Sequence, residues 1–327
     1  MINPEIISRA DEVQKTFQEA LPFRHVCIDG FLQTEFCESL LRDFPSFDTR
    51  KAINEMGEVG RKSVHEVVSD ISPFYKQFYQ YINSKEFLDA ISAITGIPDL
   101  IADETLFGGG THENLDGQPL DIHVDFNIDE RRMLHRRLNL LVYLNKEWEE
   151  TWGGLIELHS DPRHPEVDEV KSILPLFNRC VIFETSEYSW HGFETINLPE
   201  DRKHLSRKSF AIYLYTKDRP VEDAVAPHTT FYLCRPLPKD IQAGKTLTED
   251  DVRKLRNLLT QRDGFLEMYQ KLLVEKEERL RRLMNINQDM DGSGNRVNYN
   301  AILNSRSWKL VMFALSLKNK VLSLLRK

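Results

Sequence analysis

The feature that most limits the fold of this chain is a series of short apolar runs between residues 119 and 215. The runs span residues 119–125, 137–145, 154–158, 179–183 and 209–215, and turn-forming residues separate them. Runs of this length with such ends predict strands. Because many short strands in one segment are typical of a sandwich or barrel, we predict a mainly β fold of the jelly-roll type.

The N-terminal part of the chain has a different pattern, because its apolar residues recur mostly at helical spacing. We expect helices over residues 5–20 and 33–43 and two more within 71–95, with one strand over residues 23–31. These helices are predicted to support the β domain from one side.

Composition limits the class of protein. At 327 residues, with 41% hydrophobic and 29% charged residues, the chain suits one large domain with an appendage. Its net charge of −8 disfavours a nucleic-acid partner. The four cysteines form no C-x-x-C pair, which favours a reducing compartment over a disulfide framework. No signal-peptide pattern and no membrane-spanning apolar run is evident, so we expect a cytoplasmic protein.

Beyond residue 220 we predict three further segments. Residues 221–247 are irregular and are expected to form a strap or linker. Residues 248–290 predict a helical extension, whose leucines near seven-residue spacing indicate either a short coiled coil, and thus a homo-oligomer, or packing on the barrel. Residues 291–327 combine a flexible break with a basic amphipathic helix. Its part over residues 305–327 could contact a membrane surface, a partner protein or its own domain.

Three residues within the β region have the chemistry of a metal site. His123 and Asp125 are two apart, so on a strand both side chains leave from one face. His191 follows a separate apolar run. Two imidazoles and one carboxylate can bind one face of Fe(II) and leave other positions open. The alternative is that these are unrelated histidines at strand ends. Five further histidines lack ligand-like spacing among themselves and are mostly expected at the surface, although His112 could line the pocket mouth: His112, His135, His159, His164 and His228.

The ordered motifs between Phe23 and Thr216 resemble the prolyl 4-hydroxylase-like branch of the 2-oxoglutarate/Fe(II) dioxygenases. The motifs are Gly108-Gly109-Gly110, His123-Val124-Asp125, Tyr143-Leu144-Asn145-Lys146-Glu147-Trp148, Trp152-Gly153-Gly154, His191-Gly192 and Arg207-x-Ser209. The resemblance implies a double-stranded β-helix with supporting helices, which places the dioxygenase domain at residues 1–220. It also implies that His123, Asp125 and His191 are the iron ligands.

By the same resemblance, Arg207 would bind the distal carboxylate of 2-oxoglutarate, with Tyr143 donating a hydrogen bond to it and Ser209 assisting. A guanidinium suits this role, because it binds a carboxylate through two parallel hydrogen bonds and keeps its charge when buried. The interval from His191 to Arg207 is longer than the family leads us to expect, and Arg202 or Lys203 within it could replace Arg207 as the anchor. We prefer Arg207, because the alternating residues that follow place it at the head of a strand.

The implied function is that of an Fe(II)- and 2-oxoglutarate-dependent dioxygenase. Such an enzyme uses O2 to hydroxylate an unactivated C–H bond, releases succinate and CO2, and is often supported by ascorbate (vitamin C). The substrate would be a prolyl residue, an amino acid or another small metabolite, selected by loops over residues 52–66, 111–119, 127–136 and 160–174. Because Asp125 is present, hydroxylation is favoured over halogenation. The alternative is a non-catalytic binding or scaffold module with a vestigial metal site, which assembles through its helical C-terminal region.

Overall fold

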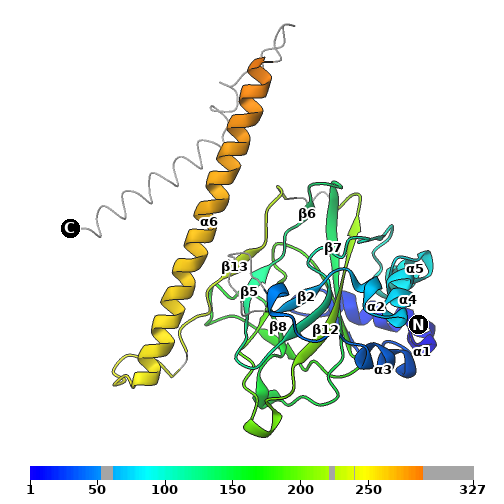
Figure 1. Ribbon diagram of the computed structural model, residues 1–327, viewed down its shortest axis with the longest axis horizontal. Helices are drawn as coiled ribbons and strands as arrows, with labels where there is room; N and C mark the ends of the chain where they lie inside the picture. Colours follow the sequence, from blue (N-terminus) through cyan, green and yellow to red (C-terminus); the bar gives the residue numbers. More distant parts are fainter. Residues whose placement is uncertain (53–61, 221–224, 239, 290–327) are drawn as a thin grey trace. The chain divides into compact units, whose positions relative to one another are not determined.

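The computed structural model describes residues 1–52, 62–220, 225–238 and 240–289, and its main body consists of two antiparallel β-sheets (Figure 1). The predicted mainly β, jelly-roll fold with supporting helices and a C-terminal helical extension is confirmed. Each of the five apolar runs predicted as strands coincides with a strand in the structure.

The larger sheet has eight strands, of which six form the path β1-β10-β7-β12-β4-β2, with β3 pairing β12 and β6 pairing β7. Its strands are β1 (His25–Ile28), β2 (Ser63–His65), β3 (Ile101–Ala102), β4 (Gly110–Asn114), β6 (Ile128–Asp129), β7 (Leu134–Tyr143), β10 (Cys180–Glu184) and β12 (Arg207–Thr216). The smaller sheet has five strands in the order β13-β5-β11-β8-β9. These are β5 (Leu120–Val124), β8 (Ile156–His159), β9 (Val170–Ile173), β11 (Trp190–Phe193) and β13 (Phe231–Leu233).

The N-terminal helices pack on the outer face of the larger sheet (Figure 1). They are α1 (Pro4–Ser8), α2 (Ala10–Glu19), α3 (Thr34–Arg42), α4 (Pro73–Ile82) and α5 (Lys85–Thr95). Alternate residues of β12, such as Phe210 and Ile212, point into this apolar layer, where the Phe210 ring centroid lies 4.9 Å from that of Phe78. The residues that alternate with these along β12, such as Ser209 and Ala211, therefore point into the space between the two sheets. The single helix predicted over residues 5–20 is interrupted at Arg9, which separates α1 from α2.

Each of the four predicted selectivity loops includes strand residues, because β2 lies within 52–66, β6 and the start of β7 within 127–136, and β9 within 160–174. Residues 53–61 of the first loop lie outside the described residues. The prediction is most clearly wrong for the loop over 111–119, whose residues 111–114 belong to the buried strand β4 between β12 and β2. Its sequence, Gly-Thr-His-Glu-Asn, lacks the apolar residues that mark a central strand. The strand forms because neighbours on both sides satisfy its backbone hydrogen-bonding groups.

The C-terminal extension is one long helix, α6 (Glu249–Asp289). It begins with a reciprocal cap, in which Asp251 N–H donates to the Thr248 hydroxyl while Thr248 N–H donates to the Asp251 carboxylate. The chain divides into two compact units, Met1–Phe265 and Leu266–Lys327, and the domain boundaries predicted from the sequence stay predictions.

Several leucines of α6 are exposed at seven-residue intervals. The exposed fractions are 50% for Leu259, 50% for Leu266, 63% for Leu273 and 54% for Leu280. The short coiled coil and the homo-oligomer nevertheless stay predictions. So does a membrane or partner contact through residues 305–327, which lie outside the described residues.

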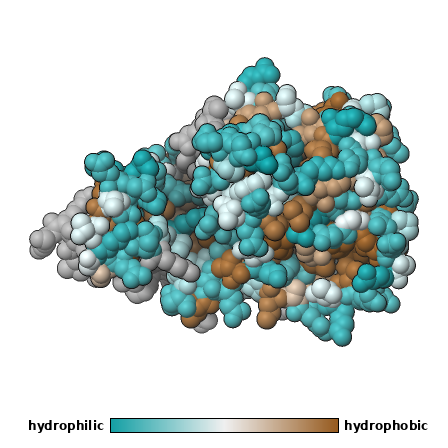
Figure 2. All heavy atoms as spheres, turned by 90° about the horizontal axis from the view of Figure 1, so that it is seen from below, coloured by the Kyte–Doolittle hydropathy of each residue, from teal (hydrophilic) through white to brown (hydrophobic). Residues whose placement is uncertain are grey.

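Among the described residues, no helix combines the length and the apolar character needed to cross a bilayer. Polar side chains predominate on the face shown in Figure 2, with apolar side chains in smaller patches between them.

A test of the β2–β4 pairing is provided by Gly110, which opens β4 with a φ of +77°. A Cβ atom added there would lie 2.0 Å from the carbonyl oxygen of His65 in β2. We expect Gly110→Ala to lower the free energy of unfolding by about 2–5 kcal/mol, because the left-handed backbone penalty and the clash add together. Chemical denaturation would measure this change.

The matched control is Gly117→Ala. Gly117 also has a positive φ, +82°, but nothing lies within 4 Å of its added Cβ. This variant should lose only about 1–2 kcal/mol, the backbone penalty alone. Equal losses in the two variants would show that the close approach of β2 contributes nothing.

Candidate metal centre

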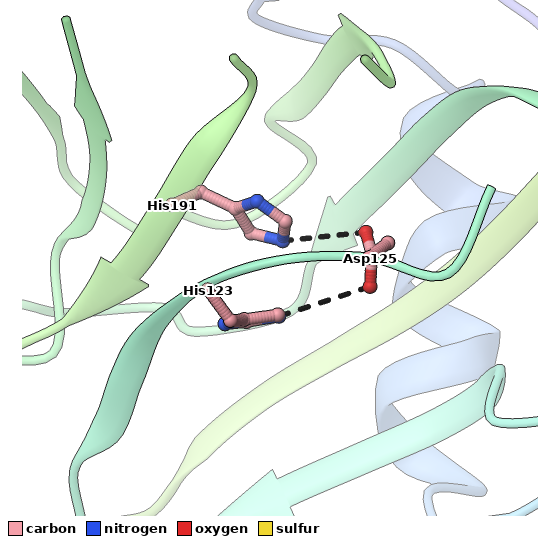
Figure 3. Close-up of side chains that lie close together, drawn as sticks. All are labelled: His123, Asp125 and His191. Carbon is pink, nitrogen blue, oxygen red and sulfur yellow. Dashed lines mark ion pairs between the residues drawn. The ribbon is translucent and has the colours of Figure 1, made fainter. Parts of the chain in front are cut away.

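His123, Asp125 and His191 come together between the two sheets. His123 lies in β5 and His191 in the neighbouring strand β11, and the two residues are directly opposite one another in the antiparallel register. Opposed residues leave a sheet on the same face, so the two imidazole centroids are only 4.2 Å apart. Asp125 follows the end of β5, two residues after His123, and both imidazoles point toward its carboxylate (Figure 3).

The distances suit a single bound cation. Nε2 of His123 is 3.8 Å from Oδ1 of Asp125, and Nε2 of His191 is 3.5 Å from Oδ2. One donor atom from each residue can be chosen so that all lie within 4.8 Å of one another. The residues His123 and His191 are 6% and 4% exposed, so the site is shielded from solvent. Two neutral nitrogens and one carboxylate oxygen on a common centre form the donor set that suits non-heme Fe(II).

Hydrogen bonds fix the tautomer of both imidazoles. Nδ1 of His123 lies 2.8 Å from the carbonyl oxygen of Asp121, and Nδ1 of His191 lies 2.8 Å from that of Ser189. Because a carbonyl can only accept, each Nδ1 carries the proton, which leaves the Nε2 lone pair free for a metal. Burial lowers the pKa of His123 to about 3 and lowers the pKa of His191, so both rings are neutral near pH 7.

Two residues not predicted from the sequence hold the Asp125 carboxylate. Nδ2 of Asn139 donates to Oδ2 of Asp125 at 2.7 Å, and a guanidinium nitrogen of Arg136 lies 3.2 Å from the same oxygen. Arg136 also donates to Oδ1 of Asn139 and stacks 3.7 Å from the Tyr213 ring centroid. Burial alone would raise the pKa of Asp125, but Arg136, the two imidazoles and Asn139 hold it well below its usual range. The carboxylate is therefore ionised and oriented.

Arg207 forms a second charged feature in the space between the sheets. It is 4% exposed, donates from Nε to the Gly154 carbonyl at 2.6 Å and from Nη2 to the Tyr143 hydroxyl at 3.1 Å, and packs 4.2 Å from the Phe193 ring centroid. Burial lowers its pKa. Among the described residues no carboxylate pairs with this guanidinium. A buried cation without a counter-charge is costly, so the arrangement suits a bound anion.

The neighbours of Arg207 supply further polar groups. Ser209, 1% exposed, is directly opposite Tyr143 on β7 and His112 on β4. These side chains share the inward face with Arg207, which lies two residues before Ser209 on the same strand. The Tyr143 hydroxyl accepts from Arg207, so its own proton can be donated to a ligand.

Of the five histidines expected mostly at the surface, His112 and His159 are buried, and His25 is a further buried histidine. His112 is 6% exposed, and its Nε2 lies 2.9 Å from the carbonyl oxygen of Gly108. His159 is 5% exposed, and its Nδ1 lies 2.6 Å from the Asp168 carboxylate. Polar partners four and nine residues away in the chain make these burials tolerable, and a search for ligand-like spacing between histidines does not reveal them.

The two alternative anchors lie elsewhere. The Arg202 side chain is 38% exposed and pairs with Glu147 and Asp201, whereas Lys203 is 36% exposed and pairs with Asp116. Both are surface ion pairs, with the counter-charge that Arg207 lacks among the described residues. The geometry therefore favours Arg207 over either of them.

The sequence segment that contains this site is similar to a known protein family. Residues 110–215 match the family model of the 2OG-Fe(II) oxygenase superfamily. The predicted resemblance to 2-oxoglutarate/Fe(II) dioxygenases is confirmed. The matched segment contains all six residues predicted for the site: His123, Asp125, Tyr143, His191, Arg207 and Ser209.

Individual relatives are more distant. The chain is 28% identical over 195 residues to prolyl 3-hydroxylase OGFOD1 of Mus musculus, an alignment that covers 57% of this chain and 32% of that protein. The chain thus spans about a third of the length of this relative. Among solved structures, it is similar to a prolyl 4-hydroxylase from Phytophthora capsici, with 16% identity, a TM-score of 0.45, and coverage of 95% of this chain and 94% of that one. It is also similar to a Pseudomonas putida prolyl-4-hydroxylase, with 15% identity, a TM-score of 0.40, and coverage of 64% and 99%.

Proposed function

We propose that this protein is an Fe(II)- and 2-oxoglutarate-dependent dioxygenase that hydroxylates a C–H bond. His123, Asp125 and His191 would hold the metal, and Arg207, Tyr143 and Ser209 would hold the distal carboxylate of 2-oxoglutarate. The observation that carries the proposal is the coexistence, between the same two sheets, of a three-donor cluster and a buried guanidinium without a counter-charge among the described residues. The match of residues 110–215 to the 2OG-Fe(II) oxygenase family model supports it.

In this proposal, the residues of the chain bind the metal and the co-substrate and orient the groups that hold them. When bound, Fe(II) and 2-oxoglutarate supply the oxidative chemistry with O2. The protein keeps both Nε2 atoms unprotonated, aims the Asp125 carboxylate, neutralises the far end of the co-substrate with Arg207, and excludes bulk water through burial. Three protein donors leave positions open on an octahedral ion for the co-substrate and oxygen.

For the substrate, we propose a prolyl residue in a peptide or protein. The support is the 28% sequence identity to prolyl 3-hydroxylase OGFOD1 of Mus musculus over 195 residues. Free amino acids and other small metabolites are the competing substrates, and the products would be the hydroxylated substrate, succinate and CO2. Ascorbate is expected to sustain turnover by returning oxidised iron to the ferrous state.

The test is turnover by the full chain, loaded anaerobically with Fe(II) and 2-oxoglutarate and then exposed to oxygen. We expect succinate formation, at a low uncoupled rate without substrate and faster with a proline-containing peptide. Mass spectrometry should show a gain of one oxygen on the true substrate. An absence of succinate from protein that demonstrably binds Fe(II) would contradict the proposal.

The alternative is a non-catalytic module that assembles through α6. The exposed leucines of that helix favour a role in assembly. Assembly and catalysis are separable, because substitution of Leu273 by aspartate should disrupt assembly and leave succinate formation unchanged. A protein that assembles, binds no 2-oxoglutarate and forms no succinate would favour the alternative.

A further inference from the structure

A continuous row of rings connects α6 with the candidate metal ligands. The Phe265 ring in α6 stacks on Tyr232 with centroids 5.4 Å apart and an interplanar angle of 14°. Tyr232 in turn lies 5.2 Å from the imidazole of His123, which lies 4.2 Å from that of His191. One side of the His123 ring therefore faces the other imidazole, and the opposite side rests on a stack that ends in the helix.

The strand β13 is what brings Tyr232 to this position. It pairs with β5 along the edge of the smaller sheet, with Tyr232 directly opposite His123. Opposed residues share a face, so the tyrosine is held beside the imidazole by backbone pairing. Phe265 closes the stack from outside and is 7% exposed. All of these residues belong to the compact unit Met1–Phe265.

A second contact from the same helix reaches Asp121, the residue whose backbone hydrogen-bonds the His123 ring. Gln261 precedes Phe265 by four residues, so both side chains leave from one face of α6. The Gln261 amide donates to the carboxylate of Asp121, which is 1% exposed. The backbone carbonyl of Asp121 accepts the Nδ1 proton of His123 at 2.8 Å. The helix thus contacts both the face of the imidazole, through Tyr232, and the residue that fixes its tautomer.

We propose that Gln261 and Phe265 of α6, acting through Asp121 and Tyr232, are positioning residues for the metal ligand His123. The inference rests on the proposed function only in taking His123 as a ligand. It assigns the first segment of the C-terminal helix a role in the metal centre. Hydrogen-bonded neighbours of metal-ligating histidines commonly affect metal affinity by 10–100-fold. Gln261 and Phe265 act through one further residue, so the lower end of that range applies.

The experiment uses the full chain and Co(II) as a probe of the site, without turnover. The variants Gln261→Ala and Phe265→Ala are each titrated with Co(II), and the visible absorption spectrum of the bound ion is recorded. We expect the Kd to rise about 10-fold in each variant and the spectrum to change, because the imidazole loses its fixed orientation. Phe265→Tyr, which keeps the ring, should restore both values.

Leu259→Ala is the matched control, because Leu259 lies on the same helix and is 50% exposed. It should leave the Co(II) affinity and spectrum unchanged. Alanine variants whose Tm falls while affinity and spectrum equal those of the wild type would overturn the inference, since that result shows a purely structural contact. Failure of the proposed function is distinguishable, because it would appear as absent succinate formation by the wild-type chain, whereas this experiment compares the Co(II) affinity and spectrum of the variants with those of the wild type.

Discussion

Replacing Asp125 with alanine is expected to reduce succinate formation by about 10³-fold, which corresponds to roughly 4 kcal/mol of lost transition-state stabilisation. The carboxylate is the one anionic donor of the His–Asp–His cluster, and its pKa is held low, so it is ionised at neutral pH. Without it, two neutral imidazoles remain, and the affinity for Fe(II) should fall at least about 100-fold. Anaerobic Fe(II) titration and succinate quantification would measure the two effects.

The control must separate loss of the site from loss of the fold. Arg136 is 2% exposed, and removal of Asp125 takes away its carboxylate, which costs about 3–5 kcal/mol for a buried pair. Asp125→Asn keeps an oxygen that can accept from Arg136 but removes the negative charge. We expect this variant to lose less stability than Asp125→Ala, because Arg136 keeps a hydrogen-bond acceptor although it loses its counter-charge, and still to lose at least 100-fold in turnover. Turnover within tenfold of wild type in the alanine variant would show that the cluster is not the catalytic site.

The local sequence pattern was sufficient to predict the strands in which the candidate site residues lie. His123 and Asp125 are separated by one residue, and the period of a strand predicts both on one face, although in the structure β5 ends at Val124, directly before Asp125. Arg207 heads an alternating run, and the structure places it at the first position of β12. These features depend on neighbours in the sequence, so the sequence alone could predict them.

The partners of Asp125 could not be predicted in the same way. Arg136 and Asn139 are three apart, so on a regular strand they would point to opposite faces. A register shift between Leu214 and Tyr215 in the pairing of β12 with β7 changes this alternation and lets both side chains reach one carboxylate. The one available signal was the presence of polar residues within an otherwise apolar run, which identifies a constrained position but not its partner.

Contacts between residues distant in the sequence explain why two further features could not be predicted. The polar strand β4 forms because β2 and β12 pair with it on both sides. Tyr232 meets His123 only through pairing of β13 with β5, more than one hundred residues earlier in the chain. Neither relation leaves a periodic pattern in the sequence. Both follow from the packing of the whole domain.

Replacing Arg207 with leucine is expected to raise the KM for 2-oxoglutarate by at least about 100-fold. Loss of one partner from a buried, charge-assisted pair costs about 3–5 kcal/mol, and each 1.4 kcal/mol is a factor of ten. Arg207→Lys keeps the charge but loses the planar fork that binds both carboxylate oxygens, so an intermediate increase is expected. Initial rates of succinate formation at varied 2-oxoglutarate concentrations would measure the effect.

Arg202→Leu and Lys203→Leu serve as matched controls, because these residues are the two other candidates for the anchor. Both side chains form surface ion pairs, so their loss should leave the KM for 2-oxoglutarate within about twofold of wild type. A large increase in either variant, together with an unchanged KM in Arg207→Leu, would move the anchor to the loop between β11 and β12.

The substitution Arg207→Leu, which should weaken 2-oxoglutarate binding, is not expected to lower the stability of the ligand-free protein. In the absence of 2-oxoglutarate the wild-type chain buries a guanidinium that no described carboxylate neutralises, and burial lowers its pKa. Replacing such a group with an apolar side chain of similar volume is often neutral or stabilising. We therefore expect the leucine variant to have an equal or higher Tm than the wild type without ligand, and to lose the increase in Tm that 2-oxoglutarate with a divalent metal gives the wild type. A wild-type Tm that 2-oxoglutarate does not change, or a variant that keeps the increase, would show that Arg207 is held in place by the protein alone and not for an anionic co-substrate.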